Sequence, residues 1–343
     1  MKMSHFIRLK MPILVLGLWV LLAGIPSFRL ATAAAEEKPD NSTKKSAPAV
    51  EKKTPQSDGK QAELTDPNTP DNKETNDQDS DIFELKLSSL ILIDEAYDRI
   101  FTPELISEEG LVKYSTLKRK RLDVLMARRE LKTLNPAILM ALSRDERIAF
   151  WINTYNFCTI ELILRHYPIQ PKWYMIIYPD NSIMQIPGGW TKEFFDIQRE
   201  EYTLQEIEQD FLLKRYKDPR ICFALSNASV GGATLRNEPY RAGRLDEQLD
   251  DQVKKYLATN KGIRWDKDNS ILHLSNVFQA HTKTFLVSDK WAAIKKFRKR
   301  KDEERIWLNF ILPHLSEEDI RYLETSEFKI KFIEFDWHLN EIK

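Results

Sequence analysis

Cysteine and net charge are both scarce in this chain. Only two of its 343 residues are cysteine, which is too few for a disulfide scaffold or for a zinc site built from cysteine alone. Lys and Arg together number 52, as do Asp and Glu, so the formal net charge is zero. A general nucleic-acid binder needs an excess of positive charge to release counterions from phosphates, so we expect no nucleic acid among the partners.

Glycine is rare as well. Ten glycines beside 16 prolines indicate short connections and no glycine-rich loop of the kind that cradles a phosphate. With 30% charged and 42% hydrophobic residues, the composition excludes a collagen-like chain, a fully disordered chain and a multispan membrane protein.

The first 35 residues have the composition of a secretory signal. Three basic residues occur among the first ten, residues 11–25 are apolar and uncharged, and residues 33–35 are alanines that offer a cleavage site. The apolar run is shorter than the roughly 20 residues that span a bilayer. We predict that residues 1–35 are a signal peptide and that the protein is secreted or periplasmic, without stable membrane insertion after cleavage. An N-terminal membrane anchor is the alternative if the signal is not cleaved.

Residues 36–82 differ from both of their neighbours. They contain no aromatic residue, and between Glu36 and Asp81 there are 12 acidic and 7 basic residues. Such a segment buries too little apolar surface to offset the entropy lost on ordering. We therefore predict a disordered polar linker here.

Residues 83–343 remain for the fold, and their length suffices for one large domain. The pattern predicts an α+β class, a mainly helical single domain with a small β-sheet. Its clearest element is a helix over 144–167, because Ser143 and Glu146 have the spacing of a capping box. Strands are predicted from short apolar runs or alternation at Trp173–Tyr178, Ile221–Ser226, Ile271–Leu274 and Phe328–Trp337.

Two amides stand out on the 144–167 helix. Asn153 and Asn156 are three residues apart on an otherwise apolar helix and share one face. A buried amide must find partners or cost about 1–3 kcal/mol. Either these side chains position a ligand, or they bond the backbone of neighbouring loops. The second interpretation is favoured, because buried polar groups are usually satisfied in this way.

Small and polar residues follow the apolar run 221–226. This polar loop, residues 226–240, contains Asn227, Ser229, Arg236 and Glu238. Site residues often lie on loops positioned by a rigid scaffold. Ser229 is a candidate nucleophile, although no glycine precedes it as in a nucleophile elbow. Arg236 and Glu238 either pair with each other or face a ligand, and a plain turn is the competing interpretation.

Histidine and cysteine offer little further chemistry. The six histidines have no metal-binding spacing, so neither a metal nor another cofactor is expected, and His281 is the one candidate base. Cys158 and Cys222 lie in apolar segments. They either form a disulfide in an oxidising compartment or remain two buried, unreactive thiols.

Six segments of the chain together resemble a known family, the domain of unknown function 547. The most specific is Phe150-Trp-Ile-Asn-x-Tyr-Asn156. The resemblance runs in order from about Phe83 to Asn340 and implies a role that is not established, with a cysteine-hydrolase or transglutaminase-like activity as an analogy only. The six segments are Gly110–Leu117, Ala149–Asn156, Asp218–Ser229, Leu235–Tyr240, Leu245–Asp250 and Phe335–Asn340.

The chain departs from the family pattern at positions suited to catalysis. The resemblance implies a cysteine where Asn227 stands, often another near Gly232, and a histidine where Gln209 stands. Asn and Gln supply neither a thiolate nor a proton shuttle.

Two hypotheses follow. The first is a non-catalytic binding or scaffold domain, in which Asn153, Asn156, Asn227, Arg236 and Glu238 contact an extracytoplasmic peptide or glycan. The second is a hydrolase or acyl-transferase acting on peptide or cell-wall amide bonds, with Ser229 and His281 as catalytic residues. The first hypothesis, a protein without enzymatic activity, is favoured.

Overall fold

The computed structural model describes residues 90–342. The predicted signal peptide (1–35) and linker (36–82) lie outside these residues. Within them the predicted class is confirmed, because helices dominate and the strands form two small sheets. A continuous hydrophobic core runs through the described residues, from Ile93 to Leu339.

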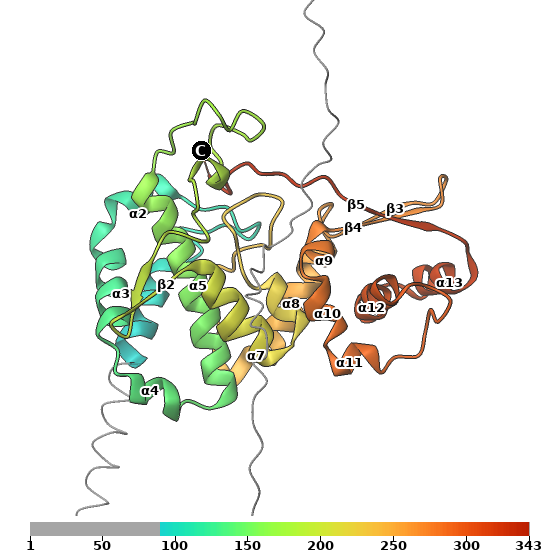
Figure 1. The fold of residues 1–343 in the computed structure, drawn as a ribbon, viewed down its shortest axis with the longest axis horizontal. Coiled ribbons are helices and arrows are strands. Elements are labelled where there is room, and N and C mark those ends of the chain that lie inside the picture. The colour runs from blue at the N-terminus through green and yellow to red at the C-terminus, as the bar shows by residue number, and fades with distance from the viewer. Residues whose placement is uncertain (1–89, 343) are drawn as a thin grey trace, which may run out of the picture. The chain divides into compact units, whose positions relative to one another are not determined.

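The N-terminal half is built around one buried helix, α5, drawn in green in Figure 1. Ser143 caps it as predicted, since Ser143 N donates to Glu146 Oε2 at 2.7 Å and Glu146 N donates to Ser143 Oγ at 3.3 Å. Its residues from Ile148 to Leu164 are all buried. The helices of this half are residues 90–100, α2 (Tyr114–Arg119), α3 (Arg121–Thr133), α4 (Pro136–Ala141) and α5 (Arg144–His166).

The middle of the chain packs against α5 in short elements. After the hairpin β1–β2, a single helical stretch contains a π-helical segment, η2, between α6 and α7. The bounds are η1 (Ile183–Gln185), β1 (Phe195–Ile197), β2 (Glu200–Tyr202), α6 (Leu204–Glu206), η2 (Ile207–Leu213), α7 (Lys214–Tyr216), η3 (Pro219–Phe223), η4 (Ala242–Arg244) and α8 (Leu245–Leu257).

Two of the predicted strands are wrong. Ile221–Ser226 begins as the 3-10 helix η3, because Asp218 accepts from Arg220 N and Pro219 occupies the first helical position. Its apolar run is buried on all sides, a case in which periodicity does not separate strand from helix. Trp173–Tyr178 is not a strand but a pair of turns on the surface, with Met175 N donating to Lys172 O and Tyr178 N to Met175 O.

The C-terminal half carries a three-stranded sheet of order β3-β4-β5, antiparallel and then parallel. The prediction at Ile271–Leu274 is confirmed as β4, and that at Phe328–Trp337 only over 329–332. The bounds are β3 (Ile263–Asp266), β4 (Ile271–Leu274), α9 (Asn276–Ala280), α10 (Thr282–Leu286), α11 (Asp289–Ala292), α12 (Asp302–Ile311), η5 (Leu312–His314), α13 (Glu317–Thr325) and β5 (Lys329–Phe332).

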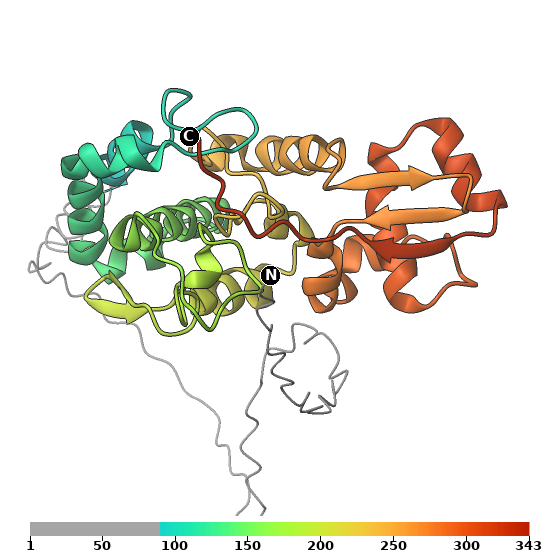
Figure 2. The same cartoon turned by 90° about the horizontal axis from the view of Figure 1, so that it is seen from above.

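One face of this sheet is covered by helices. Figure 1 shows the sheet edge-on with α12 and α13 on one side, and Figure 2 shows its three strands side by side. Aromatic rings pack between the helices and the sheet. The ring centres of Trp307 in α12 and Phe332 in β5 lie 5.4 Å apart, and those of Trp265 in β3 and Tyr322 in α13 lie 5.7 Å apart. Beyond β5, the chain leaves the sheet and returns along the N-terminal half, as the red segment of Figure 2 shows. That departure explains why the predicted strand stops early.

Candidate functional site

The two asparagines of α5 hold both ends of the polar loop. Asn153 Nδ2 donates to Tyr240 O at 2.9 Å, and its Oδ1 accepts from Tyr240 N at 2.8 Å. Asn156 Nδ2 donates to Ala224 O and its Oδ1 accepts from Ser226 N, both at 2.9 Å. Both side chains are 3% exposed. Their geometry is therefore that of a backbone clamp, which satisfies buried donors and acceptors of an irregular loop.

The Asn227 side chain folds back on its own turn. Its Oδ1 accepts from Ser229 N at 3.2 Å and from Ser229 Oγ at 2.5 Å. Ser229 is 2% exposed. A β-carbon at position 232 would overlap the Asn227 amide, so Gly232 is required beside this asparagine.

The C-terminal segment covers the start of the polar loop. Val230 N donates to His338 O and Gly231 N to Asp336 O, both at 2.8 Å. Asn340 N in turn donates to Ala228 O at 3.1 Å. A β-carbon at position 231 would lie 2.5 Å from Asp336 N, so only glycine permits this approach. The loop is therefore fastened to α5 on one side and to the chain end on the other.

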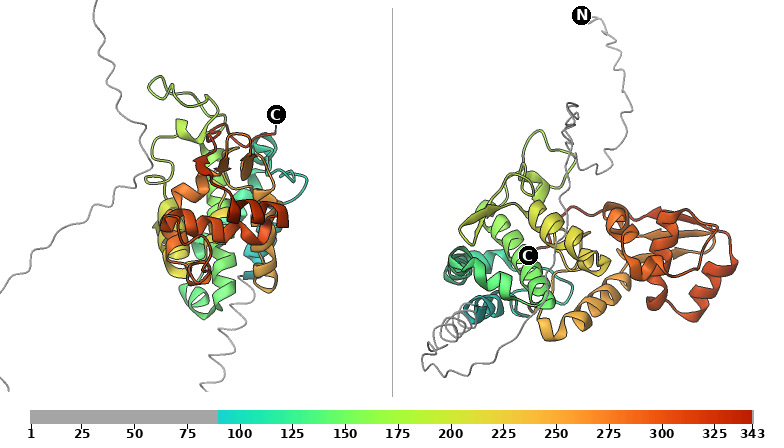
Figure 3. Two further views of the ribbon diagram at one scale, coloured as in Figure 1. Left: turned by 90° about the vertical axis from the view of Figure 1, so that its right-hand side faces the viewer. Right: turned by 60° about the horizontal axis from the view of Figure 1, so that its bottom comes forward.

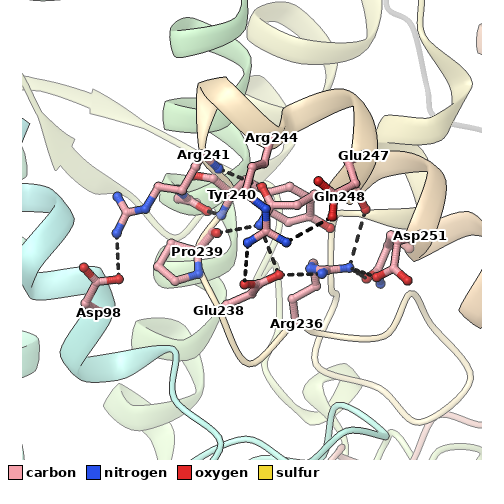
Figure 4. Close-up of polar contacts among 12 residues, drawn as sticks. Asp98, Arg236, Glu238, Pro239, Tyr240, Arg241, Arg244, Glu247, Gln248 and Asp251 are labelled. Carbon is pink, nitrogen blue, oxygen red and sulfur yellow. Dashed lines mark hydrogen bonds and ion pairs between the residues drawn. The ribbon is translucent and has the colours of Figure 1, made fainter.

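Arg236 fastens the far end of the loop to α8 (Figure 4). One guanidinium nitrogen lies 2.5 Å from Glu238 Oε1 and another 2.6 Å from Asp251 Oδ2. Burial raises the pKa of both carboxyls, but the hydrogen bonds and charge of Arg236 outweigh it and hold each pKa below its usual value. The predicted pair of Arg236 and Glu238 is present. Asp251 of α8, which was not predicted, is the third member of this ion-pair network.

Gln248 of α8 completes this network. Its Nε2 donates to Pro239 O at 3.0 Å, and its Oε1 accepts from Arg241 N at 2.8 Å. The Arg241 side chain then reaches Asp98 at 2.6 Å, as Figure 4 shows. The sequence pattern could have identified Gln248, because it lies at helical spacing from Leu245 on the apolar stripe of α8. In the structure it is only 1% exposed.

Ser229 and His281 are bound to different groups. Ser229 Oγ donates to Asn227, whereas His281 Nδ1 lies 3.7 Å from Oε1 of Glu208 in the π-helical segment η2. No hydrogen bond joins Ser229 to His281 within residues 90–342. Burial lowers the pKa of His281, although the charge of Glu208 opposes that shift. Glu208 was not predicted, and Gln209 beside it donates to its Oε1 at 2.9 Å.

Both cysteines are free thiols. Cys158 in α5 is 1% exposed and Cys222 in η3 is 2% exposed. Burial raises the pKa of both thiols well above the usual value, and the nearby Glu161 and Glu208 carboxylates act in the same direction. Of the two possibilities raised by the sequence, the structure has the unpaired thiols.

A cavity of about 190 Å³ opens where the polar loop meets the C-terminal segment. Lys261 forms part of the cavity wall, and its Nζ donates to Val230 O at 3.0 Å. Burial lowers the pKa of Lys261, while the charge of Asp336 partly restores it. The sequence held no signal for Lys261, because the cavity joins segments far apart in the chain. Its polar lining also includes Asn260, Ser275 and Asn276, together with the acidic residues Glu334 and Asp336.

Two further observations concern residues 90–342 as a whole. No cluster of three or more His, Cys, Asp or Glu side chains there has the arrangement of a metal site. None of the helices in the same stretch is both long and apolar enough to cross a bilayer.

The polar loop lies within a segment that matches a known family. Residues 139–257 match the family model described as protein of unknown function, DUF547. The matched segment extends from α4 to the end of α8, so it includes both asparagine clamps, the polar loop and Arg236. The resemblance expected from the sequence is confirmed over this segment. No curated protein and no solved structure shows significant similarity to the chain.

Proposed function

We propose that this is an extracytoplasmic, non-catalytic binding or scaffold domain that accepts a carbonyl or hydroxyl oxygen of a peptide or glycan in the cavity beside Lys261. The observation that carries the proposal is the donor set of this lysine. An ammonium has three donors, and Val230 O is the one hydrogen-bond acceptor of Lys261 among the described residues. A carbonyl or hydroxyl oxygen in the cavity would take up a remaining donor, whereas Glu334 and Asp336 in the lining disfavour an anionic ligand.

Several contacts support a binding site with a prebuilt wall. Lys261 Nζ lies 5.7 Å from the ring centre of Tyr256, whose hydroxyl bonds Ser275 Oγ at 2.7 Å and donates to Gly231 O at 3.2 Å. These bonds fix the lysine's surroundings before any ligand arrives, which lowers the entropic cost of binding. The asparagine clamps and Arg236 have the same effect on the polar loop. Asn153, Asn156, Asn227, Arg236 and Glu238 are thus assigned to shaping the site rather than to contacting the ligand.

The alternative activity has less support. A hydrolase or acyl-transferase needs a nucleophile within hydrogen-bond reach of its base. Ser229 instead donates to an amide oxygen, and His281 lies against Glu208.

Calorimetric titration tests the proposal on the chain from Glu36 onward. The titrants are a mixed peptide pool and cell-wall glycan fragments, each with free or amidated carboxyl groups. We expect binding that amidation does not weaken and that Lys261→Met weakens at least tenfold. Lys214→Met is the matched control, because Lys214 is 69% exposed and pairs with Asp210 on η2. Equal binding by wild type and Lys261→Met would overturn the site, and mass changes in the titrants, abolished by Ser229→Ala, would overturn the non-catalytic assignment.

A further inference from the structure

An apolar surface projects from the loop that follows α5. Four residues make up this apolar tip: Trp173, Tyr174, Ile176 and Ile177, whose exposed fractions are 87%, 54%, 83% and 79%. Single exposed apolar residues are ordinary on a protein surface, but four within five positions are not. In Figures 1 and 3 the green segment between α5 and η1 stands clear of the elements beneath it.

The loop that carries the tip is held in shape by one buried side chain. Gln185 is 2% exposed, and its Oε1 accepts from Lys172 N at 2.7 Å. Its Nε2 donates to Met175 O at 3.2 Å, to Tyr178 O at 3.3 Å and to Pro179 O at 3.2 Å. These bonds tie down the base of the loop from both sides. The tip is thus presented on a built support, and its exposure is a property of the fold.

The same loop is joined to the body of the domain. The ring of Tyr178 lies 5.8 Å from that of Trp337 in an edge-on contact. Leu339 N donates to Asn181 O at 2.8 Å, so the C-terminal segment supports the loop from below. The loop is therefore attached to the folded core at its base.

The chemistry of the loop fits a lipid surface. Between Tyr167 and Pro179 the single charged residue is Lys172, and it makes no ion pair within the described residues, while Asp180 follows at the base of the loop. Tryptophan and tyrosine favour the headgroup region of a bilayer, isoleucine favours the acyl boundary, and a lysine places its charge among anionic headgroups.

Part of the loop backbone, at the residues that flank the tip side chains, is bonded within the protein. The carbonyl groups of Lys172, Met175, Tyr178 and Pro179 all accept hydrogen bonds from within the protein. Each carbonyl satisfied internally is one less polar group to desolvate at a membrane. We propose that the apolar tip docks peripherally on a lipid bilayer, with Ile176 and Ile177 at the acyl boundary and Lys172 among the headgroups.

Vesicle flotation tests this proposal. The protein is the chain from Glu36 onward, which contains the whole described core but lacks the apolar run 11–25 that would itself enter a bilayer. The vesicles are phosphatidylcholine with and without phosphatidylglycerol. We expect the protein to float with the vesicles, more strongly with the anionic lipid, and the double variant Ile176→Ser/Ile177→Ser to bind at least tenfold more weakly.

The controls separate the tip from general hydrophobicity. Met140→Ser removes a side chain that is 74% exposed on α4 and should leave flotation unchanged. Lys261→Met should also float normally, so failure of the cavity proposal would not affect this one. Absence of flotation, or equal flotation of the double variant, would overturn the proposal. Self-association that the double variant abolishes, without vesicle binding, would instead assign the tip to a second copy of the chain and equally overturn it.

Discussion

Replacing Asn156 by alanine should destabilise the fold far more than a typical surface change. The substitution removes the acceptor of Ser226 N and the donor to Ala224 O, both bonded at 2.9 Å. Ala224 is 1% exposed and Ser226 is 2% exposed, so water does not readily replace the amide. Each buried group left without a partner costs about 1–3 kcal/mol. The expected loss in the free energy of unfolding is therefore about 2–6 kcal/mol, by the same principle.

Urea unfolding monitored by tryptophan fluorescence measures this loss. Domains are commonly stable by about 5–15 kcal/mol, so the variant should fold but unfold at a clearly lower urea concentration. With a slope of about 2 kcal/mol per molar urea, the midpoint should fall by about 1–3 M while the slope stays the same. Asn237→Ala is the matched control, because Asn237 belongs to the polar loop and its side chain makes no hydrogen bond within residues 90–342. Its midpoint should stay close to that of the wild type.

One result would refute the reasoning. If Asn156→Ala lost less than about 1 kcal/mol, the buried groups would not carry the penalty expected of orphaned partners. Asn156 would then be free to serve a ligand, and the clamp would be an incidental contact. A large loss with normal stability of Asn237→Ala would establish Asn156 as a structural residue of the loop.

Three further predictions concern the Arg236 network and the thiols. Arg236→Lys should lower the free energy of unfolding by about 1–3 kcal/mol in urea, because one ammonium does not bridge Glu238 and Asp251 as the planar guanidinium does. The folded protein holds the pKa of both carboxyls below the unfolded value. Their contribution to stability is therefore complete above about pH 4.5 and is lost as pH falls through the folded pKa. Thermal melts should show this loss of stability in acid, and a smaller loss in Arg236→Lys. Burial and a raised pKa should keep Cys158 and Cys222 unreactive towards a thiol reagent at pH 8, whereas both should react in denaturant; rapid labelling of the native protein would contradict this.

Local sequence patterns determined the elements whose signals are local. The capping box at Ser143 and Glu146 and the apolar composition of the following helix fixed α5 to within a residue at its C-terminal end. The apolar run at Ile271–Leu274 likewise identified β4, and the alternation at Phe328–Trp337 identified β5, although only 329–332 form the strand. These signals succeed because helix caps and side-chain periodicity depend on neighbours three or four residues away.

The two failures have different physical causes. Ile221–Ser226 has a strand-like composition, but it packs on all sides and begins with a proline-started 3-10 turn. Trp173–Tyr178 also reads as a strand, yet Gln185 draws its carbonyl groups into turns and leaves the apolar side chains outside. In the first case Asp218 and Pro219 supplied a local start signal for a helical turn, and in the second a contact from Gln185 overrode the local preference.

For the candidate site, the sequence determined which residues were polar within apolar surroundings, and it singled out Asn153, Asn156 and the Arg236–Glu238 pair. Only the tertiary structure decided what those groups bond. The partners of Asn156 lie about 70 residues away, and the cavity beside Lys261 exists only because the C-terminal segment returns to the polar loop. A sequence pattern records burial through local periodicity, whereas a hydrogen-bond partner or a cavity wall is supplied by whichever distant segment the folded chain brings alongside.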